Sequence, residues 1–313
     1  MAARAAPGDG QRIFAIVVAH NGATTLERCL THLCECDCHV VVVDNASQDA
    51  TWRILAKFPQ ITVIRQSRNL GFGLANNLGL RHALAQGASA CLLVNQDAYL
   101  SRADFDCLAR AAQSSPEYAL LTPIHWTGDG QALDPGFLYY LQHAESGALL
   151  TALLQGSATA TYAMEAAPAA CWWLARECLE RVGGFCPLFF MYGEDDDYCN
   201  RVRYHGLRVG VVPQARLLHD RASASAGRQP WRGMRWRIRY YLLPDLLDPH
   251  GKFLRHLALF CLDVAYKLFH ALMHRLWREA IALLWVGLST LPAVPYFWRV
   301  RLRHRRIGRH WLD

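Results

Sequence analysis

The run HVVVVDNAS, residues 39–47, contains four consecutive valines followed by an acidic and an amide side chain. A short β-branched run without polar alternation is typical of a strand buried on both faces, as in a parallel sheet. Similar runs occur nearby: RIFAIVVAH at 12–20, ITVIRQS at 61–67 and ACLLVNQDAYL at 90–100. Segments with helical spacing separate these runs. The N-terminal half therefore predicts an α/β fold, Rossmann-like, with a mostly parallel sheet and helices on both faces.

Polar side chains stand where three of these strands are expected to end. They are Asn21, Asp44 and Asp97. In open parallel sheets, ligands bind at the carboxyl ends of the strands. We therefore expect the functional site at this edge of the sheet.

The second half of the chain is less regular. CWWLARECLERVGGF at 171–185 predicts a strand and a short helix, and DDYCNRVRYHGL at 196–207 predicts a helix with acidic residues at its start and glycine after its end. RVGVVPQARLLHD at 208–220 predicts a strand that leads to His219. The small-residue stretch RASASAGRQP at 221–230 is the best candidate for a domain boundary.

These features predict three regions. The first is a flexible N-terminus at 1–11. The second is a main domain at 12–225, made of two halves at 12–100 and 101–225. The third is a C-terminal amphipathic helical region at 226–313.

Composition excludes several classes of protein. The 313 residues are 52% apolar and 19% charged, which is typical neither of a disordered chain nor of a multi-span membrane protein. Residues 228–313 hold 16 Lys and Arg against 5 Asp and Glu, whereas residues 1–227 hold 17 against 21. The positive charge thus belongs to the C-terminal region alone, and we expect no nucleic-acid binding by the protein as a whole.

The N-terminal MAARAAPGDGQR contains no apolar run of secretory length, so we expect a cytoplasmic protein whose eleven cysteines are reduced. Cys34, Cys36, Cys38 and His39 are close enough in sequence to form a zinc site. Their alternating spacing differs from the paired spacing of zinc knuckles, so a cysteine-rich loop before a strand is the favoured interpretation.

The C-terminal region contains two apolar stretches. Residues 252–278 have a helical pattern with a mainly basic polar face. The predicted apolar side of that pattern is Leu254, Leu257, Cys261, Ala265, Leu268, Leu272 and Leu276. Residues 281–298 are uncharged but contain Pro292 and Pro295, which favours a helix that lies in the membrane interface over one that crosses it. We expect peripheral binding to an anionic membrane surface; the alternative is an ordinary helical cap on the core.

Several residue types at the expected site favour nucleotide chemistry. Asp44 has an acceptor for the imide N–H that uracil and thymine share. Arg68 and Asn69 belong to the same edge, where Gly71 allows close approach of the backbone to a ligand. Asp97 suits a divalent cation that offsets the charge of a diphosphate leaving group, and His219 is a candidate for a further ligand.

The run MYGEDDDYCNR, residues 191–201, places four carboxylates in a row. Some of them are expected to cap the helix that follows and to favour its dipole, an interpretation that covers Asp196 and Asp197. Crowding of like charges raises carboxyl pKa values, and a carboxylate aimed into the cleft suits a general base. The run lacks the alternate spacing of calcium loops.

The ordered set VVAHNG, VVVDNASQDAT, RNLGFGLANNLGL, LLVNQDA, GGF…FFMYGEDDDYCNR and a late histidine resembles inverting family 2 glycosyltransferases of GT-A type, close to the bacterial rhamnosyltransferase-like branch. The resemblance covers roughly residues 12–222, and it implies a nucleotide-binding half at 12–100 and an acceptor and catalytic half at 101–225. It implies sugar transfer, best from dTDP-rhamnose, to a lipid-linked or polysaccharide acceptor at the inner face of the cell membrane, with Mg²⁺ or Mn²⁺ as cofactor. A UDP-sugar is the alternative donor.

The resemblance also implies roles for single residues. Asp195 is the expected catalytic base with Glu194 as its neighbour, and Asp97 and His219 are the expected metal contacts. The expected nucleotide pocket consists of Asn21, Asp44, Arg68, Asn69, Gly71 and Asn95. Trp172 and Trp173 are candidates for stacking on acceptor sugars, with core packing as the alternative.

The chain departs from the family pattern at two places. The metal motif reads Asn95-Gln96-Asp97, with a single carboxylate, and Cys186-Pro187 follow Gly-Gly-Phe where an acidic pair is common. The first departure predicts weak or partial metal dependence. It also leaves open an inactive membrane-bound assembly subunit. A nucleotidyltransferase is disfavoured because no glycine-rich, basic phosphate loop follows the first strand.

Overall fold

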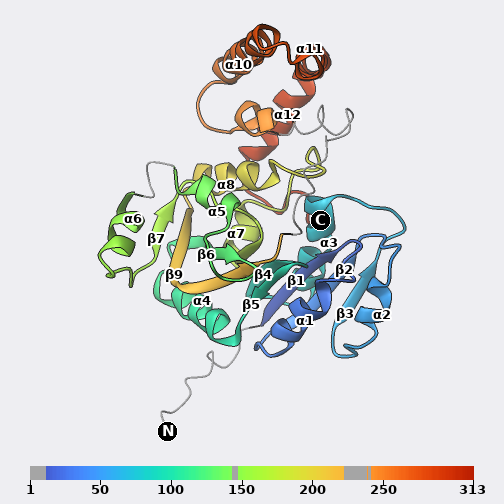
Figure 1. The fold of residues 1–313 in the computed structure, drawn as a ribbon, viewed down its shortest axis with the longest axis vertical. Helices are drawn as coiled ribbons and strands as arrows, with labels where there is room; N and C mark the ends of the chain where they lie inside the picture. Colours follow the sequence, from blue (N-terminus) through green and yellow to red (C-terminus); the bar gives the residue numbers. More distant parts are fainter. Residues whose placement is uncertain (1–11, 143–146, 222–237, 239–240) are drawn as a thin grey trace.

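The computed structural model describes residues 12–142, 147–221, 238 and 241–313. The expected flexible segment 1–11 and the expected boundary between residues 225 and 226 lie outside these ranges. Figure 1 shows the sheet and its helices at one end of the molecule and the last helices of the chain at the other.

Nine strands form one sheet: β1 Ile13–Ala19, β2 His39–Asp44, β3 Thr62–Arg65, β4 Ala90–Asn95, β5 Ala98–Leu100, β6 Tyr118–Thr127, β7 Tyr162–Met164, β8 Cys171–Ala175 and β9 Arg208–His219. The helices up to residue 221 are α1 Leu26–Cys34, α2 Thr51–Leu55, α3 Phe72–Ala85, α4 Arg102–Ser114, α5 Pro135–Tyr140, α6 Gly147–Leu154, α7 Arg176–Arg181 and α8 Glu194–Tyr204. The C-terminal helices are α10 Phe253–Met273, α11 Trp277–Thr290, the short 3₁₀ helix η2 Leu291–Ala293 and α12 Val294–His304.

The strand order is β3-β2-β1-β4-β8-β6-β9-β5, with β7 paired to β9. The four strands predicted from the valine-rich runs are mutually parallel, which confirms the parallel part of the predicted sheet. Antiparallel pairs appear beyond β4, beginning with β4 and β8. In the register, Asp44 is the partner of Ala19, and Asn95 is the partner of Val18, so both polar residues lie at one edge.

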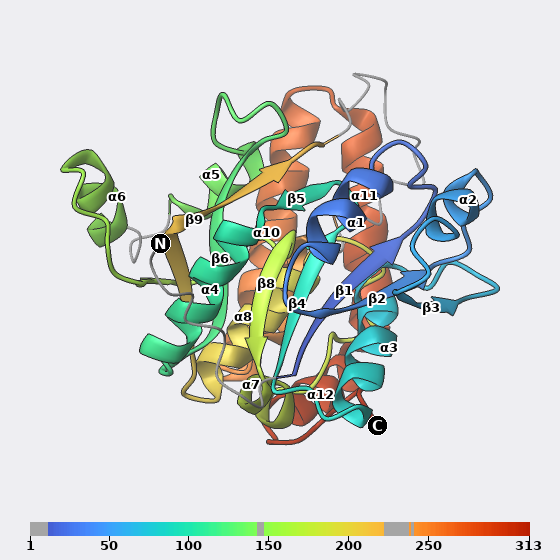
Figure 2. The same ribbon diagram turned by 90° about the horizontal axis from the view of Figure 1, so that it is seen from below.

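Helices cover both faces of the sheet, as predicted. Successive residues of a strand point to opposite faces, so a strand that is apolar throughout has to be covered on both. On β1, Ile16 belongs to one buried cluster together with residues of α3, α7 and α8, whereas Ala15 and Val17 belong to a second cluster with residues of α1 and α4. Figure 2 views the same arrangement from below, with α1 and α4 in front of the sheet.

The predicted strand 90–100 is two strands. The chain turns at Gln96-Asp97, and β5 leaves β4 to pair with β9, where Ala98 is opposite His219. The turn has a chemical consequence, because it brings Asp97 next to His219 although 122 positions separate them in sequence.

The C-terminal region is a helical layer packed on the end of the catalytic half. Its core joins Phe253, Phe260 and Phe297 to Cys186 and Phe189, which precede α8. The predicted helix 252–278 ends early, because Arg275 adopts a φ of 55° and the chain reverses into α11. The two prolines interrupt the helix predicted over 281–298, because α11 ends at Thr290. Pro292 lies in η2 and Pro295 in the first turn of α12, where a missing N–H costs little.

The apolar side predicted for 252–278 is only partly right. None of the seven predicted residues is fully buried: Leu254 is 77% exposed, and Leu257 and Leu268 are half-buried. The buried residues of α10 are Phe253, Phe260, Val264 and Ala271. The prediction failed because α10 carries apolar residues on two faces, and a single-face pattern does not tell which face the fold covers.

Candidate active site

A cavity of about 820 Å³ lies where the sheet edge, α5, α8 and the C-terminal layer meet. Asn95 and Asp97 reach it from the end of β4 and the turn after it, His219 from the end of β9, and Glu194, Asp195 and Asp196 from the first turn of α8. Asp97 and Asp195, far apart in sequence, thus line one cavity. The C-terminal part contributes Tyr241, Leu242, Asp245, Asp263 and Lys267 to its wall.

One side of the cavity holds a chain of charged contacts. His219 Nε2 lies 3.5 Å from Asp97 Oδ1, and His219 Nδ1 lies 3.3 Å from Asp134 Oδ2. Arg221 Nε donates to Asp134 Oδ2 at 2.8 Å. Burial alone would lower the pKa of His219, but the contacts with Asp134 and Asp97 outweigh it, so the pKa is raised. The raised pKa favours the protonated form of the imidazole, which suits a negatively charged ligand.

Asp134 is the residue that organises this side. It is buried, and although burial opposes ionisation, His219 and Arg221 hold its pKa below the ordinary value. Its Oδ1 also accepts the N–H of Phe137 at 3.0 Å and so caps α5. Sequence reasoning missed Asp134, although Asp134-Pro135 is a recognisable helix start.

The other side of the cavity is acidic. The hydroxyl of Tyr140, at the end of α5, lies 3.1 Å from Asp195 Oδ2 and 3.0 Å from Asp196 Oδ1. Burial, followed by the charge of Asp195, raises the pKa of Asp196 to about 7, and burial raises the pKa of Asp195 as well. Carboxylates with raised pKa values that face a cavity suit general-base catalysis at neutral pH.

Glu194 is the most deeply buried acid of this group. Burial and then the charge of Asp195 raise its pKa well above the ordinary value. Its Oε2 has no hydrogen-bond partner among the residues that the structure describes. Its surroundings therefore favour the neutral form of Glu194.

The fourth acid, Asp197, points away from the cavity. Its Oδ2 accepts from Arg201 Nε at 3.0 Å, and both side chains are buried. The expectation that Asp196 and Asp197 cap α8 is therefore wrong, because the N-cap is Gly193 and neither side chain caps the helix. A first-turn N–H does reach a side chain of the run: Asp195 Oδ1 accepts from Asp196 N at 3.1 Å. The acidic run divides into a cavity-facing group and a structural ion pair.

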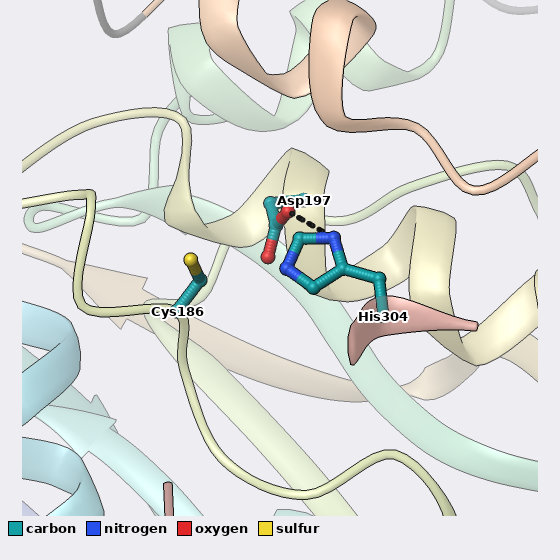
Figure 3. A group of neighbouring side chains, drawn as sticks. All are labelled: Cys186, Asp197 and His304. Atoms are coloured by element: carbon teal, nitrogen blue, oxygen red, sulfur yellow. Dashed lines mark ion pairs between the residues drawn. The ribbon is translucent and has the colours of Figure 1, made fainter. Parts of the chain in front are cut away.

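Asp197 also contacts α12. His304 Nδ1 lies 3.5 Å from Asp197 Oδ1, and Cys186 is close by, as Figure 3 shows. The donor atoms of these three residues lie within 4.8 Å of one another, a spacing that a metal ion would accept. Burial lowers the pKa of His304 to about 4 and raises that of the Cys186 thiol, so both are neutral and Arg201 already balances Asp197. We assign the cluster to the link between α8 and α12.

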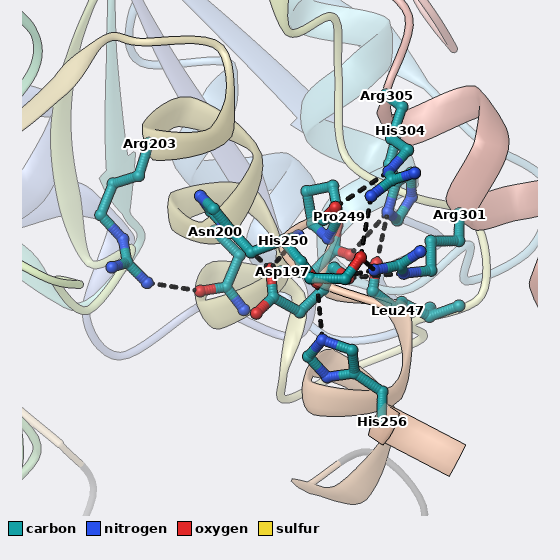
Figure 4. Close-up of polar contacts among 12 residues, drawn as sticks. Asp197, Asn200, Arg203, Leu247, Pro249, His250, His256, Arg301, His304 and Arg305 are labelled. Atoms are coloured by element: carbon teal, nitrogen blue, oxygen red, sulfur yellow. Dashed lines mark hydrogen bonds and ion pairs between the residues drawn. The ribbon is translucent and has the colours of Figure 1, made fainter. Parts of the chain in front are cut away.

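Arginines of α12 hold the segment that leads into α10. Arg301 donates to the carbonyl oxygens of Asp248 at 2.6 Å and His250 at 2.7 Å, and Arg305 donates to Pro249 at 2.9 Å. Figure 4 shows these contacts beside Asp197 and His304. The wall of the cavity near Asp245 is thus fixed by the same helix that contacts α8.

The expected nucleotide residues lie along the sheet edge, and Asn95 alone among them lines the cavity. Asp44 is buried at the end of β2 and accepts from Ser47 N at 3.0 Å. Asn21 Oδ1 accepts from Gln48 N at 2.8 Å, and Arg68 is exposed. Asn95 Oδ1 is buried without a hydrogen-bond partner among the described residues, so it remains available to a ligand.

Asn69 and Gly71 shape the loop between β3 and α3. Asn69 Oδ1 accepts from Asn45 Nδ2 at 2.9 Å and from Gly71 N at 2.8 Å. Gly71 has a φ of 82°, and a Cβ there would lie 2.2 Å from the Phe190 carbonyl oxygen. Gly71 is therefore needed for close contact with the backbone that precedes α8, a role in addition to any approach to a ligand.

The prediction that Trp172 and Trp173 stack on acceptor sugars is wrong. Trp172 is fully buried and stacks on Phe185, while Trp173 is 3% exposed and packs near Phe105 on the opposite face of the sheet. Because β8 is central and helices cover both of its faces, neither ring is exposed to a bound sugar. They are core residues.

The cysteine-rich loop also has a local explanation. The thiols of Cys36 and Cys38 point at the carbonyl oxygens of His32 and Leu33 in α1, at 3.3 and 3.7 Å. Burial raises the pKa of Cys36 to about 12. Among the described residues, the donor atoms of these cysteines and His39 form no group close enough to share a metal ion, which favours the interpretation as a cysteine-rich loop.

Comparison with known proteins agrees with this geometry. Residues 14–146 match the model of the glycosyl transferase family 2. The chain is 27% identical over 239 residues to the N-acetylglucosaminyl-diphospho-decaprenol L-rhamnosyltransferase of Mycobacterium tuberculosis, covering 69% of this chain and 78% of that protein. It is 23% identical to the dTDP-rhamnosyl transferase RfbF of Shigella flexneri, covering 66% and 68%.

Solved structures support the fold. The crystal structure of S. aureus TarS 1-349 matches with a TM-score of 0.55 at 16% identity, covering 95% of this chain and 89% of that chain; of a longer TarS chain, 41% is covered. GalNAc-T7 with UDP, GalNAc and Mn²⁺ matches with a TM-score of 0.59 at 14% identity, covering 97% and 56%. Residues 14–146 therefore carry a family 2 glycosyltransferase domain, and the chain is a glycosyltransferase that resembles the rhamnosyltransferases of that family.

Proposed function

We propose that the chain transfers rhamnose from dTDP-rhamnose to a hydroxyl of a lipid-linked or polysaccharide acceptor in cell-surface glycan synthesis, with inversion at the anomeric carbon. One observation carries the proposal: a single cavity has a histidine and a carboxylate on one side and a group of carboxylates with raised pKa values on the other. The first side suits a leaving diphosphate and the second suits an acceptor hydroxyl.

The donor sugar rests on the two relatives whose names specify rhamnose. Asp44 is proposed to accept the imide N–H of the pyrimidine, with Asn21, Arg68, Asn69 and Gly71 along the same edge and Asn95 at the cavity. An imide is common to thymine and uracil, so a UDP-sugar is the second candidate donor, and structural neighbours have been solved with UDP and UDP-GlcNAc.

The acceptor side is proposed to work through Asp195. The acceptor hydroxyl gives its proton to an Asp195 carboxylate oxygen as the hydroxyl oxygen attacks the anomeric carbon. The bond from that carbon to the diphosphate oxygen breaks at the same time, and the diphosphate leaves with the electron pair. Tyr140 fixes the carboxylate and Glu194, neutral behind it, adds no second charge. Positioning and electrostatics supply most of the rate.

A divalent cation fits the leaving-group side. A carboxylate of Asp97, the imidazole of His219 and the unpartnered oxygen of Asn95 are oxygen and nitrogen donors that Mg²⁺ or Mn²⁺ accepts. When bound there, the cation would offset the charge that develops on the diphosphate. With one carboxylate in this set, the Arg221 guanidinium carries part of that task, and weak metal dependence follows.

The acceptor is proposed to be membrane-bound, and the protein is proposed to lie at the cytoplasmic face of the membrane. The mycobacterial relative is named for a decaprenol diphosphate acceptor. The C-terminal layer, which supplies one wall of the cavity, is the most basic part of the chain.

The test is donor turnover by the purified full chain. We expect release of dTDP from dTDP-rhamnose in the presence of an acceptor, with slower release of UDP from UDP-sugars, and a product of inverted anomeric configuration by NMR. Asp195→Asn should lower turnover by about 10²–10⁴-fold, because the hydroxyl then loses its base.

Asp129→Asn is the matched control, since Asp129 is an exposed acid in the turn after β6. Absence of turnover with every donor would favour the inactive assembly subunit. Equal turnover by the Asp195→Asn variant would remove Asp195 from the mechanism.

A further inference from the structure

Two stripes of exposed apolar side chains run along α10 and α11. Within each stripe the residues are three or four positions apart, which places them on one face of the helix. The stripe of α10 is Leu259, Leu262, Tyr266, Phe269 and Met273; the stripe of α11 is Trp277, Ile281, Leu284, Leu288 and Leu291. We name these ten residues the outer face. Leu262 and Leu288 are 66% and 70% exposed.

The opposite faces of the same helices are apolar as well, and they are packed. Phe260 and Val264 of α10 and Val286 of α11 lie in the C-terminal core, and Ala271 and Leu283 form a smaller cluster. By length and composition Phe253–Met273 and Trp277–His304 would suffice to cross a membrane, yet only 17% and 33% of their most apolar windows are buried. Each helix thus carries apolar residues on two faces, and one of these faces has no protein cover among the described residues.

The charge around the outer face indicates what covers it. Outside the cavity wall, residues 252–279 contain four cationic side chains, Lys252, Arg255, Arg275 and Arg278, against Glu279; Lys267 lines the cavity and is paired with Asp263. In a dimer formed through this face, the cations of one copy would lie near the same cations of the other copy and repel them. Anionic lipid headgroups would attract them, and Tyr266 and Trp277 are ring types that favour the membrane interface.

We propose that the outer face docks on a lipid bilayer by inserting its apolar side chains, with the basic residues as a secondary attraction. Figure 1 shows α10 and α11 as the outermost layer at one end of the molecule, so that no part of the sheet obstructs a flat surface there. Because salt screens charges but not the insertion of apolar side chains, this binding should persist at high salt, whereas binding by a basic tail alone should not.

Docking by this face would place the active site at the bilayer. Asp263 and Lys267 of α10 line the cavity, and the residues just before them, Leu262 and Tyr266, belong to the outer face. In the docked protein, α10 would therefore lie between the cavity and the lipid. The active site can then bind a lipid-linked acceptor while the lipid of that acceptor stays in the membrane. This consequence rests on the proposed function, whereas the docking itself does not.

Flotation of the full chain with vesicles tests the docking without any turnover. The probes are vesicles of neutral phosphatidylcholine alone and of phosphatidylcholine with phosphatidylglycerol, each at about 50 mM and about 500 mM salt. We expect the chain to float with both compositions at both salt concentrations. The double variant Leu262→Ser with Leu288→Ser should partition at least about tenfold less, because two apolar anchors are lost.

Leu154→Ser is the control, because Leu154 of α6 is 89% exposed but lies far from the outer face (Figure 1). It should float like the unchanged chain, and unaltered thermal unfolding of both variants shows that the fold is kept. Flotation confined to anionic vesicles at low salt would overturn apolar docking. A vesicle-free dimer that the double variant disperses would overturn it in favour of self-association. Transfer to a water-soluble acceptor is measured separately, so failure of docking and failure of the proposed function are distinguishable.

Discussion

At the scale of the residue, Tyr140 is the side chain that most directly sets the chemistry of the acidic wall. Its hydroxyl lies within 3.1 Å of both Asp195 and Asp196, and a donated hydrogen bond favours the charged form of a carboxylate. The pKa values of both acids are raised by burial, and Tyr140 opposes this rise. In Tyr140→Phe the pKa values should therefore rise further, and the acidic limb of the pH–rate profile should move to higher pH.

The expected loss is on the order of tenfold in kcat near pH 6 and less at pH 8, where the acids ionise even without the hydroxyl. The measurement is kcat against pH for dTDP release. Tyr162→Phe, which removes a hydroxyl from β7 outside the cavity, should leave the profile unchanged. A uniform fall of kcat at every pH would mean that Tyr140 only supports the fold.

At the scale of the element, α8 carries both the proposed catalytic acids and a buried ion pair that fixes it. Arg201 and Asp197 are both buried, one turn apart. Arg201→Met leaves a buried carboxylate without its partner and should cost about 3–5 kcal/mol of unfolding free energy, measured by urea denaturation. Lys57→Met breaks the exposed pair with Glu27 and should cost less than about 1 kcal/mol. Equal costs would show that the buried pair does not hold α8.

The elements that sequence predicted best are those whose pattern is local. The strands ending at Ala19, Asp44 and Asn95 were found because a run of β-branched residues already identifies a buried strand. The break after Asn95 was missed because it depends on pairing of β5 with β9, a contact between distant parts of the chain. The pair Trp172-Trp173 was misjudged because an aromatic residue looks the same in a core and in a sugar site.

The candidate site shows the same limit. Asp97, His219 and Asp195 were named from motifs, and they line one cavity. Asp134 and Tyr140 went unnoticed, because their importance arises from what α5 touches at its two ends: His219 at one and the acids of α8 at the other. Sequence spacing carries no information about such contacts.

At the scale of the whole molecule, the C-terminal layer forms part of the cavity in addition to its proposed docking on the membrane. It supplies Tyr241, Asp245 and Lys267 to the cavity wall, and His304 to the link with α8. Its core includes Phe189, which precedes α8. We therefore expect a chain that ends at Arg221 to lose donor turnover even with a water-soluble acceptor, and to unfold at least about 10 °C lower in a thermal scan, because apolar surface beside α8 is uncovered.

The double variant Leu262→Ser with Leu288→Ser is the natural comparison for this shortened chain. It alters the outer face alone, so it should keep the unfolding temperature and the turnover of a water-soluble acceptor while it loses vesicle binding. The two changes thus separate the structural role of the C-terminal layer from its membrane role. A shortened chain that still turns over a soluble acceptor at the full rate would show that α10, α11 and α12 form a separable anchor, and that the cavity wall they supply is dispensable for the reaction.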